Sequence, residues 1–173
     1  VEILLENGLL KEEDGEYQPG KGGIISLSQE SEPRLRSLFM VHEGYHGIFF
    51  SNSQYRAESF NTWNALSELE QNFWKEFLKL RKYNVNDLFL IVNEFQAYLM
   101  QVEEARLDAY YWDYTVPGLA EAVPRIRNLI ERLGREYPDT FHKSAKFIEA
   151  AVRKAAGIGA EDLVCLTRIT ESM

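Results

Sequence analysis

Residues 41–47 read Val-His-Glu-Gly-Tyr-His-Gly and contain two of the three histidines of the chain. On an α-helix, residues four apart lie on the same face, so the rings of His42 and His46 can hold one metal ion between them. Glu43 lies beside that face, where its carboxylate can take a proton from a water molecule without binding the metal. The spacing therefore predicts a zinc site with a general base on a helix. The alternative is a helix with two buried, hydrogen-bonded histidines.

The sequence around this stretch predicts a helix over about residues 33–50. Leu35, Phe39 and Phe49 recur at helical spacing on the face that carries the histidines, so we expect this face to lie in the core. Buried imidazoles need polar partners, and a metal ion is one way to supply them.

Residues 88–100 read Leu-Phe-Leu-Ile-Val-Asn-Glu-Phe-Gln-Ala-Tyr-Leu-Met and are apolar almost all round, which predicts a buried helix. Glu94 is the one carboxylate in this segment. An ionised carboxylate is rarely buried unless it is paired or binds a metal, so we expect Glu94 to be the third zinc ligand. A buried salt bridge from Glu94 to Arg106 or Arg125 is the competing interpretation.

Two other positions bear on the third ligand. Glu58, twelve residues after His46, is a weaker candidate because its neighbours suggest the exposed start of a helix. A histidine six residues after the second motif histidine is another well-known third ligand, but position 52 is Asn and excludes it.

The pattern His42-Glu43-x-x-His46 on one helix, with Asn93-Glu94 on a buried later helix, resembles the gluzincin group of zinc metallopeptidases, to which thermolysin belongs. The resemblance implies a zincin-like fold in which His42, His46 and Glu94 bind zinc. It also implies that Glu43 acts first as general base and then as proton donor. The implied reaction is hydrolysis of peptide bonds in a protein or peptide substrate.

The sequence departs from the gluzincin pattern in its supporting residues. Thermolysin-like enzymes carry an acidic residue one turn after the third ligand, whereas this position is Tyr98, whose phenol can still accept a hydrogen bond. No motif marks the residue that stabilises the oxyanion, and the candidates are Tyr98, Tyr45 and His142, the remaining histidine.

The N-terminal part predicts a helix, a turn and a strand. Asn7-Gly8 is typical of a helix C-terminus, and residues 12–15 form a polar turn. A helix followed by a hairpin can belong to a winged helix, but the acidic residues of this turn disfavour contact with DNA. Residues 24–28, Ile-Ile-Ser-Leu-Ser, predict a strand whose edge either holds an extended peptide or belongs to a small structural hairpin.

The rest of the chain predicts further helices. An apolar stripe predicts one helix over about residues 57–82. The aromatic cluster at residues 108–114 is expected in the core or an interface, and the alternative is that it lines a peptide pocket. Three helices are expected after it: one over residues 119–133, one opened by Pro138-Asp139 and closed by Gly157, and a short one over residues 163–169. The expected fold class is therefore mainly α, with a short N-terminal strand or hairpin.

The composition is that of one globular domain, and we expect residues 1–173 to form it. Because the chain does not begin with Met, we expect a fragment or processed part of a larger protein. The net charge of −8 disfavours binding to nucleic acid. The single cysteine, Cys165, excludes an internal disulfide. No apolar run reaches membrane-spanning length and no targeting segment is present, so we favour the cytoplasm without fixing the compartment.

Two other classes of protein remain compatible with the sequence. A ferritin-like di-metal carboxylate protein would combine Glu43-x-x-His46 with Asp139-x-x-His142. The weakness of that interpretation is that Asp139 directly follows a proline at a helix end, and that His42 has no role. The other class is a catalytically inactive zincin-like domain that only binds a partner.

Overall fold

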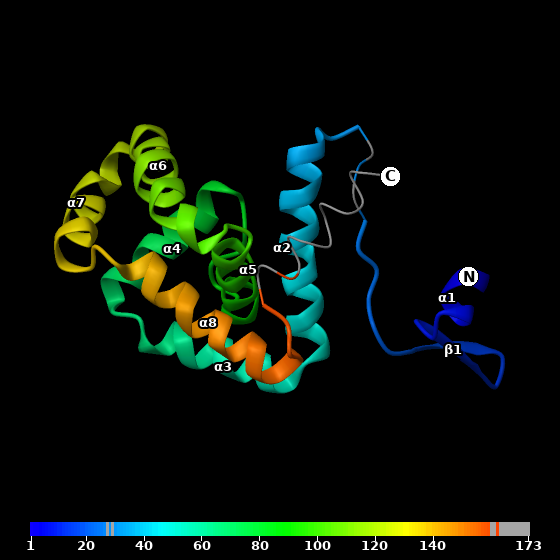
Figure 1. Cartoon of the computed structure of the whole chain (residues 1–173). Coiled ribbons are helices and arrows are strands. Elements are labelled where there is room, and N and C mark those ends of the chain that lie inside the picture. Colours follow the sequence, from blue (N-terminus) through cyan, green and yellow to red (C-terminus); the bar gives the residue numbers. More distant parts are fainter. Residues whose placement is uncertain (27, 29, 160–161, 163–173) are drawn as a thin grey trace.

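The computed structural model describes residues 1–26, 28, 30–159 and 162, which form a mainly helical fold with one small hairpin (Figure 1). This confirms the predicted fold class. The strands β1 (Leu10–Glu13) and β2 (Glu16–Pro19) pair antiparallel, with Leu10 opposite Pro19. The helical elements are, in order, α1 (Glu2–Glu6), α2 (Pro33–Ser51), α3 (Ser53–Ala65), α4 (Glu68–Leu80), α5 (Leu88–Met100), η1 (Glu104–Arg106), η2 (Ala109–Thr115), α6 (Val116–Ala122), η3 (Pro124–Ile126), α7 (Arg127–Glu136) and α8 (Thr140–Ala156).

Helix α5 is the centre of the helical body. It packs against α2 on one side and contacts α3, α4 and α8 on its other sides (Figure 1). Asp87 caps its start, because the Asp87 carboxylate accepts the Leu90 N–H at 3.1 Å. Nine of its 13 residues are buried, as the nearly all-apolar sequence predicts. Any polar side chain in the middle of α5 is therefore held inside the protein.

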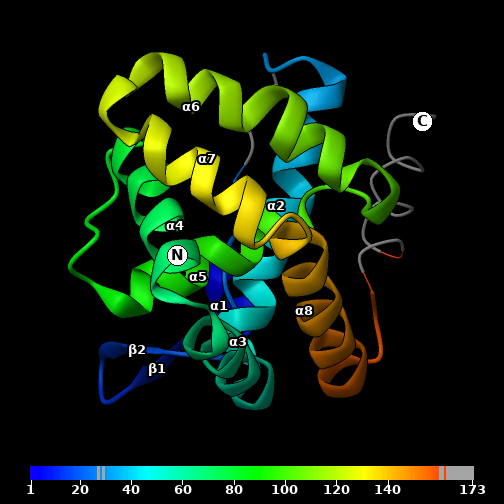
Figure 2. The ribbon, with the colours of Figure 1, turned by 90° about the vertical axis from the view of Figure 1, so that its left-hand side faces the viewer.

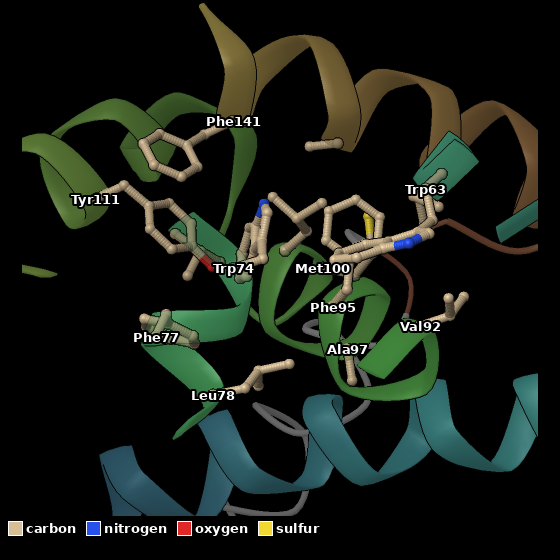
Figure 3. Close-up of a cluster of buried hydrophobic side chains, with 14 of the residues drawn as sticks. Trp63, Trp74, Phe77, Leu78, Val92, Phe95, Ala97, Met100, Tyr111 and Phe141 are labelled. Atoms are coloured by element: carbon tan, nitrogen blue, oxygen red, sulfur yellow. The ribbon is translucent and has the colours of Figure 1, made fainter. Parts of the chain in front are cut away.

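An aromatic core fills the space around α4, α5 and α8 (Figure 3). The rings of Trp74 on α4 and Phe95 on α5 meet edge to face, with centroids 5.1 Å apart. Tyr111, in the middle of the predicted aromatic cluster, is fully buried and stacks on Phe141 of α8 at 4.2 Å. Tyr114, at the end of the same cluster, is exposed. The core prediction is therefore confirmed for the inward-facing member of the cluster.

Helix α2 is covered over only part of its length. It spans the predicted residues, and His42 and Phe49 are buried. Leu35 and Phe39 on the same face are each 42% exposed, so the prediction of a continuous core face is wrong for the first turns. The reason is that the start of α2 extends beyond the helices that cover its second half (Figure 1).

The single helix predicted over residues 57–82 is two helices. α4 begins after Ser67, whose hydroxyl accepts the Glu70 N–H at 3.3 Å while the Glu70 carboxylate accepts the Ser67 N–H at 2.7 Å. This capping box satisfies amide groups at the start of a new helix. The apolar stripe continues across the break, so helical periodicity alone did not reveal it.

The strand predicted at residues 24–28 is wrong. Residues 24–26 and 28 belong to no strand, and Ile24 and Ile25 are 68% and 43% exposed. A β-branched segment needs a partner strand, and within the described residues β1 and β2 pair only with each other. Of the turn predicted at residues 12–15, residues 14–15 form the hairpin turn, whereas Glu12 and Glu13 belong to β1. α1 with its hairpin stands apart from the helical body (Figure 1).

The C-terminal helices largely follow the predicted order. The helix expected over residues 119–133 is interrupted at Pro124, which has no N–H to continue α6. α7 then packs on α4 and beside α6 (Figure 2). α8 begins after Asp139 and ends at Gly157, whose φ of 69° suits glycine, as predicted. The helix expected over residues 163–169, and Cys165 within it, lie outside the described residues.

No helix in the described part of the chain combines the length and the apolar character needed to cross a membrane.

Candidate metal centre

His42 and His46 of α2 and Glu94 of α5 bring three ligand atoms together. The Nε2 atoms of the two rings are 3.0 Å apart, and each lies 3.5 Å from a carboxylate oxygen of Glu94. A tetrahedral zinc ion with bonds of about 2.0–2.1 Å holds its ligand atoms about 3.3 Å apart. The rings face different oxygens of Glu94, Oε2 for His42 and Oε1 for His46, and the measured separations bracket this value. The cluster therefore has about the size of a zinc site.

Packing of α2 on α5 creates this cluster. The two histidines are one helical turn apart on the face of α2 that meets α5, and Glu94 projects from the buried middle of α5. Their side chains are only 9%, 13% and 8% exposed, for His42, His46 and Glu94 respectively. Within the described residues, these three form the one group of His, Cys, Asp and Glu side chains with the geometry to hold a metal ion.

The other nitrogen of each imidazole faces an amide oxygen. His42 Nδ1 lies 2.9 Å from Gln101 Oε1, and His46 Nδ1 lies 2.9 Å from Asn93 Oδ1. An amide oxygen only accepts hydrogen bonds, so each Nδ1 must carry the proton. The lone pair of each neutral ring then sits on Nε2, directed at the cluster. Metal-binding histidines are commonly oriented by this kind of hydrogen bond.

Further hydrogen bonds orient these amide groups. The Gln101 NH₂ group donates to the Tyr110 hydroxyl at 3.2 Å, which leaves its oxygen for His42. Asn93 Oδ1 also accepts from Gln96 Nε2 at 3.4 Å, and the Gln96 oxygen accepts the Tyr55 hydroxyl at 2.6 Å. Both imidazoles are therefore held in the tautomer that presents Nε2 to the cluster.

The cluster brings hydrogen-bond acceptors together, and one of them lacks a donor within the described residues. Two Nε2 lone pairs and a carboxylate face one another, and Glu94 Oε2 is buried with no hydrogen-bond partner among the described residues. Glu70, the other buried carboxylate in the described chain, shows the contrast: its two oxygens accept hydrogen bonds from Ser67 N–H and the Thr140 hydroxyl. A buried acceptor without a partner costs about 1–3 kcal/mol, and more when it is charged. A cation between the three atoms, a metal ion or a shared proton, removes this cost.

Neither arginine considered as a partner of Glu94 reaches it. Arg106 lies 3.9 Å from Glu103, and Arg125 pairs with Glu76 at 2.7 Å. The salt-bridge interpretation of Glu94 is therefore wrong. Glu58, the weaker ligand candidate, accepts a hydrogen bond from Asn61 on the surface of α3 and is not in the cluster.

Glu43, the predicted general base, follows His42 on α2 and is half-buried. It is not one of the clustered ligand atoms, which agrees with a role that does not involve binding the metal. In the described part of the chain it forms no hydrogen bond or ion pair, so none of the described side chains occupies its carboxylate.

The three candidates for oxyanion stabilisation lie in different surroundings. The Tyr98 ring contacts that of His42, with centroids 4.7 Å apart, so Tyr98 borders the cluster. His142 on α8 instead pairs with Glu104 at 2.6 Å, and its hydrogen bond lowers the pKa of that carboxyl. Within the described residues, His142 has no hydrogen bond, ion pair or ring contact with the three ligands. Tyr45 is fully buried, and its hydroxyl has no hydrogen-bond partner among the described residues.

Tyr83, in the connection from α4 to α5, also borders the cluster. Burial raises the pKa of the Tyr83 phenol. Its hydrogen bond with Tyr98 and the negative charge of the nearby Glu94 carboxylate each raise this pKa further. The backbone turns at Lys82, whose φ is 67°, and this turn places Tyr83 beside the cluster. The Tyr83 N–H then donates to the Leu78 carbonyl at 3.1 Å. Local sequence carries no signal for this tertiary contact, and Tyr83 was not predicted.

The second pair of a ferritin-like site is not assembled. Asp139 lies at the start of α8, and His142 is engaged by Glu104 rather than directed at Glu43 or His46. Together with the single metal-binding group among the described residues, this disfavours the di-metal interpretation.

Comparison of the chain with protein families, with curated proteins and with solved structures finds no match. A function is therefore argued from the chemistry of the site, since a fold alone does not determine function.

Proposed function

We propose that this chain is a zinc-dependent peptidase in which His42, His46 and Glu94 bind the metal and Glu43 is the general base. The observation that carries the proposal is the convergence of two Nε2 atoms and the buried Glu94 carboxylate, whose Oε2 has no hydrogen-bond partner among the described residues. Nitrogen and oxygen ligands suit zinc, and three protein ligands leave a fourth position for water or substrate. Closed structural zinc sites usually have four protein ligands, so a three-ligand set favours catalysis.

Each residue of the site would have a separate role in hydrolysis. Bound zinc supplies Lewis acidity, which polarises a carbonyl group and acidifies water. Glu43 would accept the proton of the attacking water and deliver it to the leaving amine. Gln101 and Asn93 hold the two imidazoles in one tautomer. Tyr98, at the edge of the cluster, can donate a hydrogen bond to the carbonyl oxygen as negative charge develops on it.

Peptides are the proposed substrates because of two short motifs. His42-Glu43-x-x-His46 with Asn93-Glu94 resembles the gluzincin metallopeptidases, and the described fold supplies both motifs from packed helices. The net charge of −8 also disfavours nucleic acid as the substrate. A domain that binds zinc without hydrolysing peptides is the alternative that the experiment must separate.

The test is hydrolysis of a fluorogenic peptide library by the zinc-reconstituted chain and by the Glu43→Gln variant. Loss of a general base typically slows a reaction by about 10²–10⁴-fold, so we expect Glu43→Gln to lose hydrolysis and keep its zinc. Glu58→Gln, a matched change on α3, should keep both. Wild-type rates in Glu43→Gln would refute the role of Glu43, and no cleavage by the zinc-loaded wild type would refute the peptidase.

A further inference from the structure

The guanidinium group of Arg81 lies beside the metal centre and has no carboxylate partner among the described residues. Arg81 caps the C-terminus of α4, and its Cζ lies 3.6 Å from the centroid of the Phe77 ring and 5.3 Å from that of Tyr98. Within the described residues Arg81 forms no ion pair, although the chain has 27 acidic residues and 19 Lys and Arg. An arginine in an acidic protein that stacks on rings and has no acidic partner retains its capacity to bind an anion.

Tyr98 connects this charge to the metal ligands. The Tyr98 ring contacts the His42 ring, with centroids 4.7 Å apart. The Arg81 guanidinium lies over the same Tyr98 ring. The positive charge is therefore separated from a metal ligand by a single aromatic ring. Tyr83, two residues after Arg81, reaches the same ring and the carboxylate of Glu94.

Two contacts with Phe77 fix the position of Arg81. The Phe77 ring holds the guanidinium by a cation–π contact, and Nη1 donates to the Phe77 carbonyl at 3.3 Å. An arginine at a helix C-terminus is stabilising by itself, which gives a purely structural reason for its presence. That interaction occupies one of five N–H donors, so most of the guanidinium remains available to a ligand.

We propose that Arg81 binds a carboxylate of the substrate, so that the centre prefers peptides with a carboxylate one or two residues beyond the scissile bond. This inference rests on the proposed peptidase function and specifies its substrate class. The path from the His42 ring to the guanidinium consists of the 4.7 Å step to the Tyr98 ring and the 5.3 Å step beyond it. An extended residue spans about 3.3–3.6 Å, so one or two residues and the contact between carboxylate and guanidinium cover this path. Either a C-terminal carboxylate or an Asp or Glu side chain supplies the required group.

The experiment compares peptides that differ only in this charge. One pair has the same sequence with a free C-terminal carboxylate or a C-terminal amide, and a second, amidated pair has Glu or Gln after the scissile bond. Because charge-assisted hydrogen bonds are the strong ones, we expect the zinc-loaded wild type to favour one carboxylate peptide by about 10-fold or more in kcat/KM. The pair that shows the preference identifies the source of the carboxylate.

Two variants connect the preference to Arg81. Arg81→Ala removes the guanidinium, and Arg81→Gln keeps a donor for the Phe77 carbonyl without the charge. Both should cleave the acid and amide peptides equally. Arg127→Ala, an exposed change on α7, should keep the wild-type preference, and thermal melts show that each variant is folded.

The outcomes separate this inference from the proposed function. Cleavage without any carboxylate preference, or a preference that survives in both Arg81 variants, would overturn the inference and leave the peptidase intact. If no peptide is cleaved, the same peptide pairs are titrated calorimetrically into zinc-loaded Glu43→Gln chain with and without Arg81→Gln. Binding that favours the carboxylate and depends on Arg81 then supports the anion site while the peptidase fails. Equal binding of both peptides rejects the site.

Discussion

The nitrogen atoms of His42 and His46 that face away from the cluster explain why the site suits a cation. Each Nδ1 is held at 2.9 Å from an amide oxygen, and this contact decides which nitrogen carries the proton. Two fixed lone pairs then converge with the Glu94 carboxylate, whose Oε2 finds no hydrogen-bond partner in the described part of the chain. The histidines and Glu94 were predictable from spacing and from the isolated charge in an apolar segment. The role of Gln101 was not predicted, although Gln101 lies two turns after Glu94 and therefore on the same face of the helix.

Removing the hydrogen-bond acceptor of His42 should weaken zinc binding. Gln101→Leu frees the imidazole to rotate or change tautomer, and loss of such supporting contacts typically costs about 10–100-fold in metal affinity. The measurement is competition with a chelator of known affinity. Gln54→Leu, an exposed change on α3, serves as the control. An unchanged affinity in Gln101→Leu would show that the contact does not orient the ring.

Removing the third ligand should have a larger effect. Glu94→Ala eliminates the only carboxylate of the cluster, and we expect its zinc affinity to fall by more than that of Gln101→Leu. Glu70→Ala, which removes the other buried carboxylate, should lower stability but keep zinc affinity in the folded fraction. If Glu94→Ala binds zinc as tightly as the wild type, Glu94 is not a ligand.

The helices that carry the site were more predictable than the connections that orient them. α2 and α5 follow from periodicity and from a long apolar run, because both signals are local. The break between α3 and α4 was missed, although Ser67 and Glu70 have the spacing of a capping box. The strand expected at residues 24–28 failed because strand formation depends on a distant partner that local sequence does not specify.

The capping box should contribute measurably to stability. Ser67→Ala removes the acceptor for the Glu70 N–H, and we expect the free energy of unfolding to fall by about 1 kcal/mol. Urea denaturation followed by circular dichroism measures the change. Ser53→Ala, an exposed position in the first turn of α3, should have a smaller effect. Equal effects of the two substitutions would contradict the stabilising role of the box.

Buried tyrosines give the complete fold a defined response to alkali. Burial raises the pKa of Tyr45, Tyr55 and Tyr111 above its ordinary value. The folded chain keeps these phenols protonated, whereas the unfolded chain releases their protons near pH 10. Stability is therefore fully present below about pH 10 and falls as the pH rises further.

A titration that follows tyrosinate absorbance and helical circular dichroism together checks this prediction. We expect the buried tyrosines to ionise only as the helices unfold. Ionisation of all nine tyrosines before any loss of helix would contradict the burial of these three side chains.

Zinc should stabilise the entire fold, because its ligands join α2 to the central helix α5. A ligand that binds only the folded state at 100 times its dissociation constant adds about 2.7 kcal/mol. We therefore expect the midpoint of thermal unfolding to fall when a chelator removes zinc and to recover when zinc is restored. A midpoint that does not respond to the metal would contradict a site between these helices.

Metal stoichiometry tests the central claim most directly. Elemental analysis of the purified chain, after equilibration with zinc and removal of excess metal, should give one zinc per chain. His46→Ala should contain none, and His142→Ala, which changes the histidine paired with Glu104, should still contain one. Absence of zinc from the wild type, its retention in His46→Ala, or two iron or manganese ions per chain would contradict a mononuclear zinc centre at His42, His46 and Glu94.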